Sequence, residues 1–408
     1  MTLTDLAVRD GILTPERAEL VERMRALGPA IAARSADYDR QASFPSANWE
    51  DFADAGLLGI CVPRSAGGLG GDFVGYALVA EELGRHCGAT ALTFNMHVAT
   101  TLLVGQIADD LDFDSDERAL LEQRRTALWA GIIEDGTIHS QPFSEGLAPG
   151  ATAGIGTTAQ PTDGGYLVTG RKIFASLSGA ANVHNVVCLA DGDPRVRLMG
   201  VPADAEGVRI EGTWDPVGMR ATDSRNLILD AAMVPEGNEW LPPGAFEQAA
   251  RRWPYFYMTL SFAYLGLMGA IMDATSSYLI GDGSDGARRN HPIKQQGWAQ
   301  MHLAYETAQA LCYRVLGEAG PDPDAAQMRR AWASTITTME TAPELASTAL
   351  RVCGGRSLLR PSPLEQYYRD ARCGATMLPW SVEVCLDRLG RADLFPERNH
   401  ELNADIRK

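Results

Sequence analysis

The chain has 408 residues, is 45% hydrophobic and 22% charged, and carries a formal net charge of −16. These values predict a globular protein of two or three domains with a sizeable core. They argue against nucleic-acid binding, because phosphate contacts require dense Lys and Arg.

Secretion, membrane insertion and metal binding are not expected. The N-terminal sequence MTLTDLAVRD lacks the basic-then-apolar pattern of a signal peptide, and no stretch approaches the roughly 18 continuous apolar residues of a membrane span. The seven Cys residues include no Cys-x-x-Cys pair, and the seven His residues are scattered. We therefore expect a cytoplasmic protein with reduced thiols and no metal site.

The first third of the chain is predicted to be helical. Thr14 and Pro15 form a helix start, with a capping hydroxyl followed by Pro in the first turn. Apolar residues at helical spacing follow, and the same pattern returns at 49–58 and 76–85. Between these two stretches lies a Gly- and Pro-rich segment at 62–71, which is predicted to be a loop.

The middle third changes to short β-type runs separated by turn signals. The runs lie at 166–169, 186–190, 198–201 and 226–229. They follow one another too closely for crossover helices, so a small antiparallel barrel or sandwich is predicted.

The last third returns to helix. An apolar stripe at 260–278 ends at Gly281, and Ala-rich helical stretches follow at 299–317 and 325–352. Pro379 is predicted to start a final helix. The order of helices, strands and helices predicts an α+β fold that is mostly helical.

Two short stretches have the residue types that a flat, amphipathic cofactor needs. Phe143 is followed by Ser144, and Phe174 is followed two residues later by Ser176. An aromatic ring can pack on the face of such a cofactor while hydroxyls bind its polar edge. Each pair taken alone is more typical of the ordinary core of a β-domain.

Three further features have both a functional and a structural interpretation. The adjacent Gly354 and Gly355 either allow a close backbone approach to a ligand or end a helix. Arg369 and Asp370 suit a structural ion pair. His97 lies among apolar residues and suits a buried position in the core.

Several segments, in this order, resemble the acyl-CoA dehydrogenase superfamily over nearly the whole chain. Residues 62–85 are similar to its Val-Pro-x-x-x-Gly-Gly-x-Gly loop and following Glu-Glu helix, and residues 143–145 stand where it has a hydrophobic-Thr-Glu triplet. Residues 172–176 are similar to its Lys-x-Trp-Ile-Thr strand, and residues 217–220 to its Leu-Gly-x-Arg segment. Residues 353–372 resemble its Gly-Gly-x-Gly and Arg-Asp-Ala-Lys stretch.

The resemblance implies an N-terminal helical domain at 1–128, a middle antiparallel β-barrel at 129–240 and a C-terminal four-helix bundle at 241–408. It implies FAD between barrel and bundle, in a homodimer or homotetramer. The implied flavin contacts are Phe143, Ser144, Phe174, Ser176, Gly354 and Gly355. Ser176 would lie near flavin N5, and the two glycines would approach the FAD of a neighbouring subunit.

The proton acceptor of the family is missing from both of its usual places. A typical member has a Glu after Arg-Asp-Ala-Lys that removes the α-proton of the acyl thioester, and that position is Leu378 here. Members with the Glu on the first bundle helix would place it at Phe256. Neither side chain accepts a proton. Glu340 and Glu383 suit surface positions better than this role, so no catalytic base is assigned.

A second departure concerns the diphosphate of FAD. Where the family has Arg-x-x-Phe-Gly, residues 286–290 read Gly-Ala-Arg-Arg-Asn. Arg288 or Arg289 would supply the missing charge, and Arg351, which replaces a family Gln, offers another. FAD is the expected cofactor; weak FAD affinity, or FMN in its place, are the alternatives.

Three functions remain open. The leading hypothesis is a flavin-dependent oxidoreductase that passes hydride between the β-carbon of an acyl thioester, or a related small substrate, and N5, with an electron acceptor as partner. The second is a flavin monooxygenase of the same fold that depends on a separate flavin reductase. Pro379 has the spacing of that group's His-Asp-Pro, but Met377 and Leu378 replace His and Asp. The third is a non-catalytic partner subunit or binding protein.

Overall fold

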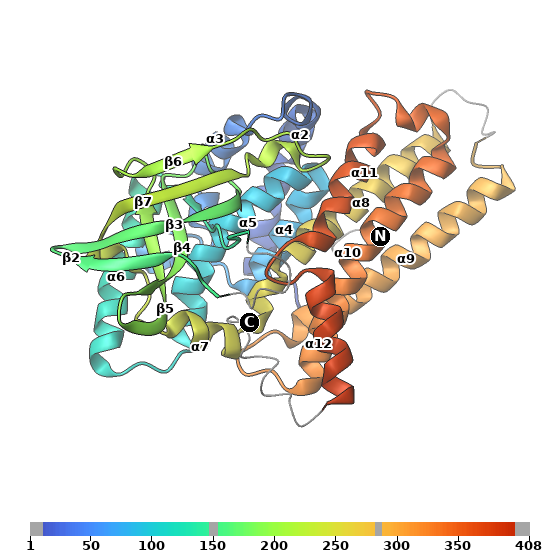
Figure 1. Cartoon of the computed structure of the whole chain (residues 1–408). Helices are drawn as coiled ribbons and strands as arrows, with labels where there is room; N and C mark the ends of the chain where they lie inside the picture. Colours follow the sequence, from blue (N-terminus) through green and yellow to red (C-terminus); the bar gives the residue numbers. More distant parts are fainter. Residues whose placement is uncertain (1–10, 147–153, 282–287, 396–408) are drawn as a thin grey trace.

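In a computed structural model, a curled β-sheet lies at one side of the molecule and the long helices of the last third lie at the other, with helices of the first third packed against both (Figure 1). The structure describes residues 11–146, 154–281 and 288–395. Helices from the first third cover one side of the sheet, and the long helices of the last third extend away from it. The prediction of a mostly helical α+β fold is confirmed.

The first third is helical, as predicted. They are α2 (Pro15–Gln41), α3 (Ser46–Asp54), α4 (Phe73–His86), α5 (Gly88–Leu102) and α6 (Ser115–Glu134). Thr14 caps α2 as predicted, because its hydroxyl accepts the backbone N–H of Arg17 at 3.3 Å. The boundary predicted at 128 falls within α6.

The middle segment forms a seven-stranded curled sheet. Its strands are β1 (His139–Ser140), β2 (Thr158–Thr162), β3 (Gly165–Ala175), β4 (Val183–Ala190), β5 (Asp193–Pro202), β6 (Val208–Glu211) and β7 (Arg225–Pro235). The order is β1-β4-β2-β3-β7-β6, with β5 paired to β4. The prediction of a purely antiparallel sheet is wrong, because β4 runs parallel to both β1 and β2.

Alternation along β4 separates two hydrophobic cores. Val186 and Cys188 face the inside of the curl, whereas Val187 belongs to the larger core formed with the helices. Successive side chains of a strand point to opposite faces, so a strand with apolar residues on both faces is covered on both. The sheet is therefore fixed against the helices on its outer face.

The last third is a set of helices grouped around one long member. They are α7 (Ala245–Arg252), α8 (Thr259–Ile280), α9 (Pro292–Glu318), α10 (Ala325–Cys353), α11 (Pro363–Cys373) and α12 (Val382–Leu394). Helix α10 packs against α8, α9, α11 and α12. The final helix begins at Val382 rather than at Pro379, because Ser381 supplies its N-cap.

Helix α8 is the central link between the first and last thirds. A Cβ on Gly84 of α4 would lie 2.1 Å from the carbonyl oxygen of Ala263, and a Cβ on Gly266 would lie 2.0 Å from that of Glu81. The two helices can therefore cross this closely only with glycine at both positions. The segment Pro254–Ile280 is long and apolar enough to cross a membrane, but 89% of its most apolar window is buried in the fold. Burial in the core therefore explains the apolar character of this segment.

Candidate functional site

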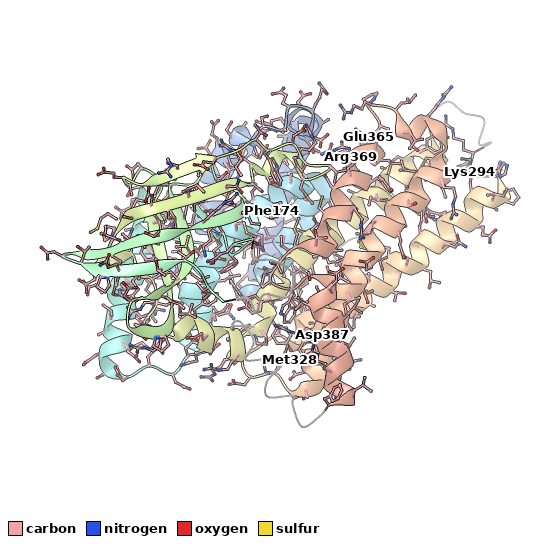
Figure 2. The ribbon with its side chains drawn as sticks, viewed as in Figure 1. Phe174, Lys294, Met328, Glu365, Arg369 and Asp387 are labelled. Atoms are coloured by element: carbon pink, nitrogen blue, oxygen red, sulfur yellow. The ribbon has the colours of Figure 1, made fainter. Side chains whose placement is uncertain are left out.

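The end of strand β3 presents an exposed aromatic ring. Phe174 has a left-handed backbone conformation, with φ of 51°, and is 65% exposed. Its ring lies edge-on to Trp214, with 6.3 Å between the ring centroids. Figure 2 shows Phe174 at the end of the sheet that is nearest the helices of the last third. A ring this exposed is available to pack on a flat ligand.

A run of hydroxyl groups begins two residues after this ring. Ser176 Oγ lies 2.8 Å from Ser224 Oγ, which lies 2.7 Å from Thr222 Oγ1. Thr222 donates its hydroxyl proton to the carbonyl oxygen of Met219 at 2.9 Å. Neither Thr222 nor Ser224 is predicted from the sequence, where their only signal is a position just after segment 217–220.

Segment 143–145 is held against the same strand. The N–H of Ile173 donates to the carbonyl oxygen of Ser144 at 2.8 Å. Phe143 packs on Phe246, with 5.7 Å between the ring centroids. The structure therefore brings Phe143 and Ser144 to the strand end that bears Phe174.

Glu145 and Lys172 form an ion pair that ties this segment to the sheet. Lys172 Nζ donates to Glu145 and to the carbonyl oxygen of Val187, the latter at 3.0 Å. Glu145 also accepts from Thr157 Oγ1 at 2.7 Å and from the N–H of Gly156 at 2.6 Å. Burial acts to raise the pKa of Glu145, but the charge of Lys172 and the hydrogen bonds from Lys172, Thr157 and Gly156 together outweigh it, so the pKa is lowered. Burial lowers the pKa of Lys172, while Glu145 acts in the opposite direction.

The loop after β6 is clamped to helix α11. The N–H of Met219 donates to Asp370 Oδ1 at 2.5 Å. A Cβ on Gly218 would lie 2.3 Å from the carbonyl oxygen of Arg369. Burial raises the pKa of Asp370 to about 7, against the lowering effect of the Met219 N–H. Helix α11 therefore fixes the carbonyl group on which the hydroxyl run ends.

Arg369 and Asp370 do not form the predicted ion pair. Arg369 pairs instead with Asp39 of α2 at 2.7 Å and with Glu365 at 2.9 Å. Figure 2 shows Glu365 and Arg369 along α11, beside the first third of the chain. Helix α11 thus joins α2 to the sheet loop.

Substituting Gly218 with Ala is expected to lower the free energy of unfolding by about 1–3 kcal/mol. The added Cβ meets the backbone of α11, which cannot move aside as a flexible side chain can. Gly237→Ala is the matched control, because a Cβ there meets nothing within 4 Å. Urea unfolding of both variants measures the difference, and equal midpoints would contradict the close contact.

The remaining predicted contacts gather at the ends of α8, α9 and α10. Arg288 donates to the carbonyl oxygen of Tyr278 at 3.2 Å, and its guanidinium lies 4.4 Å from the centre of the Tyr278 ring. Lys294 lies 5.2 Å from the same ring and donates to the carbonyl oxygen of Val352. Both cations are therefore engaged within the chain. Residues 286 and 287 belong to the segment that differs from the family's Arg-x-x-Phe-Gly motif, and they lie outside the described residues.

Gly354 and Gly355 present open backbone next to this group. A Cβ would meet nothing within 4 Å at either position, and Gly354 has φ of 81°. In Figure 2, Lys294 lies at the end of α9 away from the sheet, whereas Phe174 lies on the sheet. Within one chain, the predicted flavin contacts therefore lie in two separate groups, one at the end of β3 and one at the ends of α8, α9 and α10.

The two places where the resemblance puts the family's base hold apolar side chains. Leu378, between α11 and α12, is 54% exposed, and Phe256 is buried. Glu340 lies on α10, 3.6 Å from Arg372. The two line a surface hollow of about 440 Å³, whose lining includes none of the predicted flavin contacts. Glu383 is exposed, so both carboxylates have the surface positions expected for them.

A buried polar network joins α5 to the sheet. His97 Nε2 donates to the carbonyl oxygen of Leu58 at 2.9 Å, and its Nδ1 accepts the N–H of His139 at 3.1 Å. The network continues through Asn185, which receives the indole N–H of Trp240 at 2.7 Å. The predicted core position of His97 is confirmed, whereas the sequence does not predict its hydrogen-bond partners.

Burial keeps the histidines of this region neutral. It lowers the pKa of His97 to about 4 and that of His139 to about 3. His184, whose Nδ1 lies 2.8 Å from Ser140 Oγ, has its pKa lowered by burial to about 4. Strand β1, which contains His139 and Ser140, leads directly into segment 143–145.

Profiles of three successive domains match the chain. The N-terminal domain of acyl-CoA dehydrogenase matches residues 14–109, the middle domain residues 144–232 and the C-terminal domain residues 254–378. The chain belongs to the acyl-CoA dehydrogenase family. The resemblance inferred from its motifs is confirmed, and the protein is a flavoprotein of this fold.

Relatives in the family differ in their reactions. The putative acyl-CoA dehydrogenase YdbM of Bacillus subtilis is 26% identical over 378 residues, which cover 89% of this chain and 93% of YdbM. The L-evernosamine nitrososynthase of a Micromonospora species is 27% identical over 410 residues, covering 95% and 93%. FMN-bound TdsC of Paenibacillus, a dibenzothiophene monooxygenase, is 20% identical with a TM-score of 0.80, covering 92% of this chain and 97% of TdsC. This last likeness establishes the fold alone.

Proposed function

We propose that the protein is a flavin-dependent monooxygenase that receives reduced flavin from a separate reductase. The observation that carries the proposal is Leu378, an aliphatic side chain where the dehydrogenases of the family carry their proton acceptor. Phe256 occupies the alternative position and accepts no proton either. A site without a base suits oxygen transfer better than removal of an α-proton. The nitrososynthase relative, aligned over 95% of this chain, supports the same choice.

The residues at the end of β3 fit a flavin. Phe174 offers an exposed ring for its face, and Ser144 and Ser176 offer polar groups for its edge. Reduced flavin, when bound, would supply two electrons, so that one atom of dioxygen enters the substrate and the other leaves as water. In this proposal Leu378 and Phe256 contribute an apolar, non-basic wall.

We infer that FMN suffices as the cofactor. The ADP half of FAD needs positive charge at its diphosphate. Of the three arginines that the sequence offers for this role, Arg288 is stacked on Tyr278 and bonded to its carbonyl oxygen. Arg289 and Arg351 are exposed, and an exposed cation contributes little to an ion pair. Dissociation constants measured for FMN and FAD should therefore be similar. If FAD bound at least a hundredfold more tightly than FMN, this inference would be contradicted. Arg288, Gly354 and Gly355 would then be assigned to the FAD site again.

Two mixing experiments on purified protein loaded with FMN or FAD test the reaction. Without oxygen, a panel of acyl-CoAs is expected to leave the visible flavin band unchanged, because the chain offers no base at Leu378 or Phe256. After reduction and exposure to oxygen in the presence of dibenzothiophene or indole as trial acceptors, the band is expected to return together with a product that contains one oxygen atom more than the acceptor.

Bleaching by an acyl-CoA would contradict the monooxygenase and establish the dehydrogenase, which the YdbM relative favours. A protein that takes up neither flavin would contradict both reactions and leave a binding or partner role.

A further inference from the structure

The hydroxyl run behind Ser176 has a fixed direction. Each hydroxyl has one proton to donate, whereas a carbonyl oxygen can only accept. Thr222 must therefore donate its proton to the carbonyl oxygen of Met219, 2.9 Å away. Its oxygen then accepts the proton of Ser224 at 2.7 Å, and the oxygen of Ser224 accepts that of Ser176 at 2.8 Å. All three contacts are satisfied together only in this direction.

The acceptor that sets this direction is held firmly. The carbonyl oxygen of Met219 also accepts the backbone N–H of Thr222 at 3.2 Å and, more weakly, the indole N–H of Trp214 at 3.4 Å. The N–H of Met219 is held by Asp370. Thr222 is 1% exposed and Ser224 is 5% exposed, so water has little access to turn the hydroxyls around. Ser176, at the open end of the run, is left with lone pairs for an outside partner.

We propose that this run makes Ser176 a hydrogen-bond acceptor toward the flavin, so that the protein binds reduced flavin in preference to oxidised flavin. The inference rests on the proposed function and on the family resemblance, which implies that Ser176 lies near N5. The N5 atom of oxidised flavin carries no proton and can only accept, whereas N5 of reduced flavin carries a proton and donates. One hydrogen bond made in one state and missing in the other corresponds to about a tenfold difference in affinity. Thr222 and Ser224 are then positioning residues for the cofactor.

Titrations of the whole protein with oxidised and reduced FMN under anaerobic conditions test this preference. We expect reduced FMN to bind about tenfold more tightly, which raises the two-electron midpoint potential of bound FMN by about 30 mV over that of free FMN. Thr222→Val removes the acceptor for the proton of Ser224 while keeping the shape of the side chain. Ser224 is then free to donate to Ser176, whose own proton can turn toward N5. The preference should fall to about equal affinities or reverse.

Thr222→Ser is the matched control, because it keeps the hydroxyl and should keep the potential of the unchanged protein. A merely structural role would weaken the binding of both redox forms alike and leave the potential unmoved. Ser176→Ala gives a second, independent reading: reduced FMN should bind about tenfold more weakly, while the affinity for oxidised FMN stays the same.

Equal affinities in the unchanged protein would overturn the inference, as would a preference that survives in both Thr222→Val and Ser176→Ala. Either result leaves the proposed function standing. Failure to bind FMN in any redox state would instead contradict the proposed function itself.

Discussion

Replacing Lys172 with Met is expected to lower the free energy of unfolding by about 3–5 kcal/mol, as is typical when one partner of a buried ion pair is removed. The side chain of Lys172 is fully buried and that of Glu145 is 11% exposed. Without Lys172, the Glu145 carboxylate keeps its bonds to Thr157 and Gly156 but loses its only salt-bridge partner among the described residues. The variant also weakens the attachment of segment 143–145 to the sheet, although the bond from the Ile173 N–H to the Ser144 carbonyl oxygen remains, so flavin affinity should fall with stability.

The double variant Lys172→Met/Glu145→Gln distinguishes a lost charge pair from lost packing. With both charges removed, stability should recover by at least 1–2 kcal/mol relative to Lys172→Met alone, roughly the coupling seen between contacting residues. Arg40→Met is the surface control: Arg40 is 57% exposed and pairs with Asp37, so its loss should cost only about 0–1 kcal/mol. Urea unfolding gives all values. A double variant less stable than Lys172→Met would show that packing, rather than the charge pair, is what holds the segment.

Local patterns were sufficient for most helices and for the long strands. The Ala-rich stretch at 325–352 became α10, Ala325–Cys353, and the capping pattern at Thr14 placed the start of α2. Both signals lie within a few residues of the structure that they predict. The parallel pairing of β1 with β4 had no such signal. Its partners lie 44 residues apart, at His139 and Val183, and β1 has two residues.

The candidate site divides in the same way. Phe174 and Ser176 could be recognised because an aromatic ring and a hydroxyl stand close together in the sequence. Ser224 could not be recognised, because it meets Ser176 across a sequence separation of 48 residues. Arg369 was assigned to its neighbour Asp370, whereas its partner Asp39 lies 330 residues away. Partners that are set by tertiary packing leave no local pattern, which explains why both Ser224 and Asp39 were missed.

Lowering the pH from 7 to 5 is expected to reduce the free energy of unfolding by about 2 kcal/mol for each of three buried histidines. In the unfolded chain the imidazoles protonate near pH 6.5, whereas folding lowers the pKa of His97 and His184 to about 4 and that of His139 to about 3. Between these values the unfolded state binds more protons at these groups than the folded state, so their contribution to stability falls as the pH falls. From about one pH unit above 6.5 neither state is appreciably protonated, and the contribution is constant. Asp370, whose pKa folding raises to about 7, contributes in the opposite direction.

The contact between α5 and β1 should fail first, because His97 Nδ1 accepts the N–H of His139. A proton on that nitrogen would set two donors against each other within a buried network. His97→Gln removes one titrating group, so its loss between pH 7 and pH 5 should be smaller than that of the unchanged protein by about 2 kcal/mol. His302→Gln, at an exposed position on α9, should keep the full loss. Urea unfolding at each pH measures these differences, and an unchanged loss in His97→Gln would show that the buried histidines do not govern acid stability.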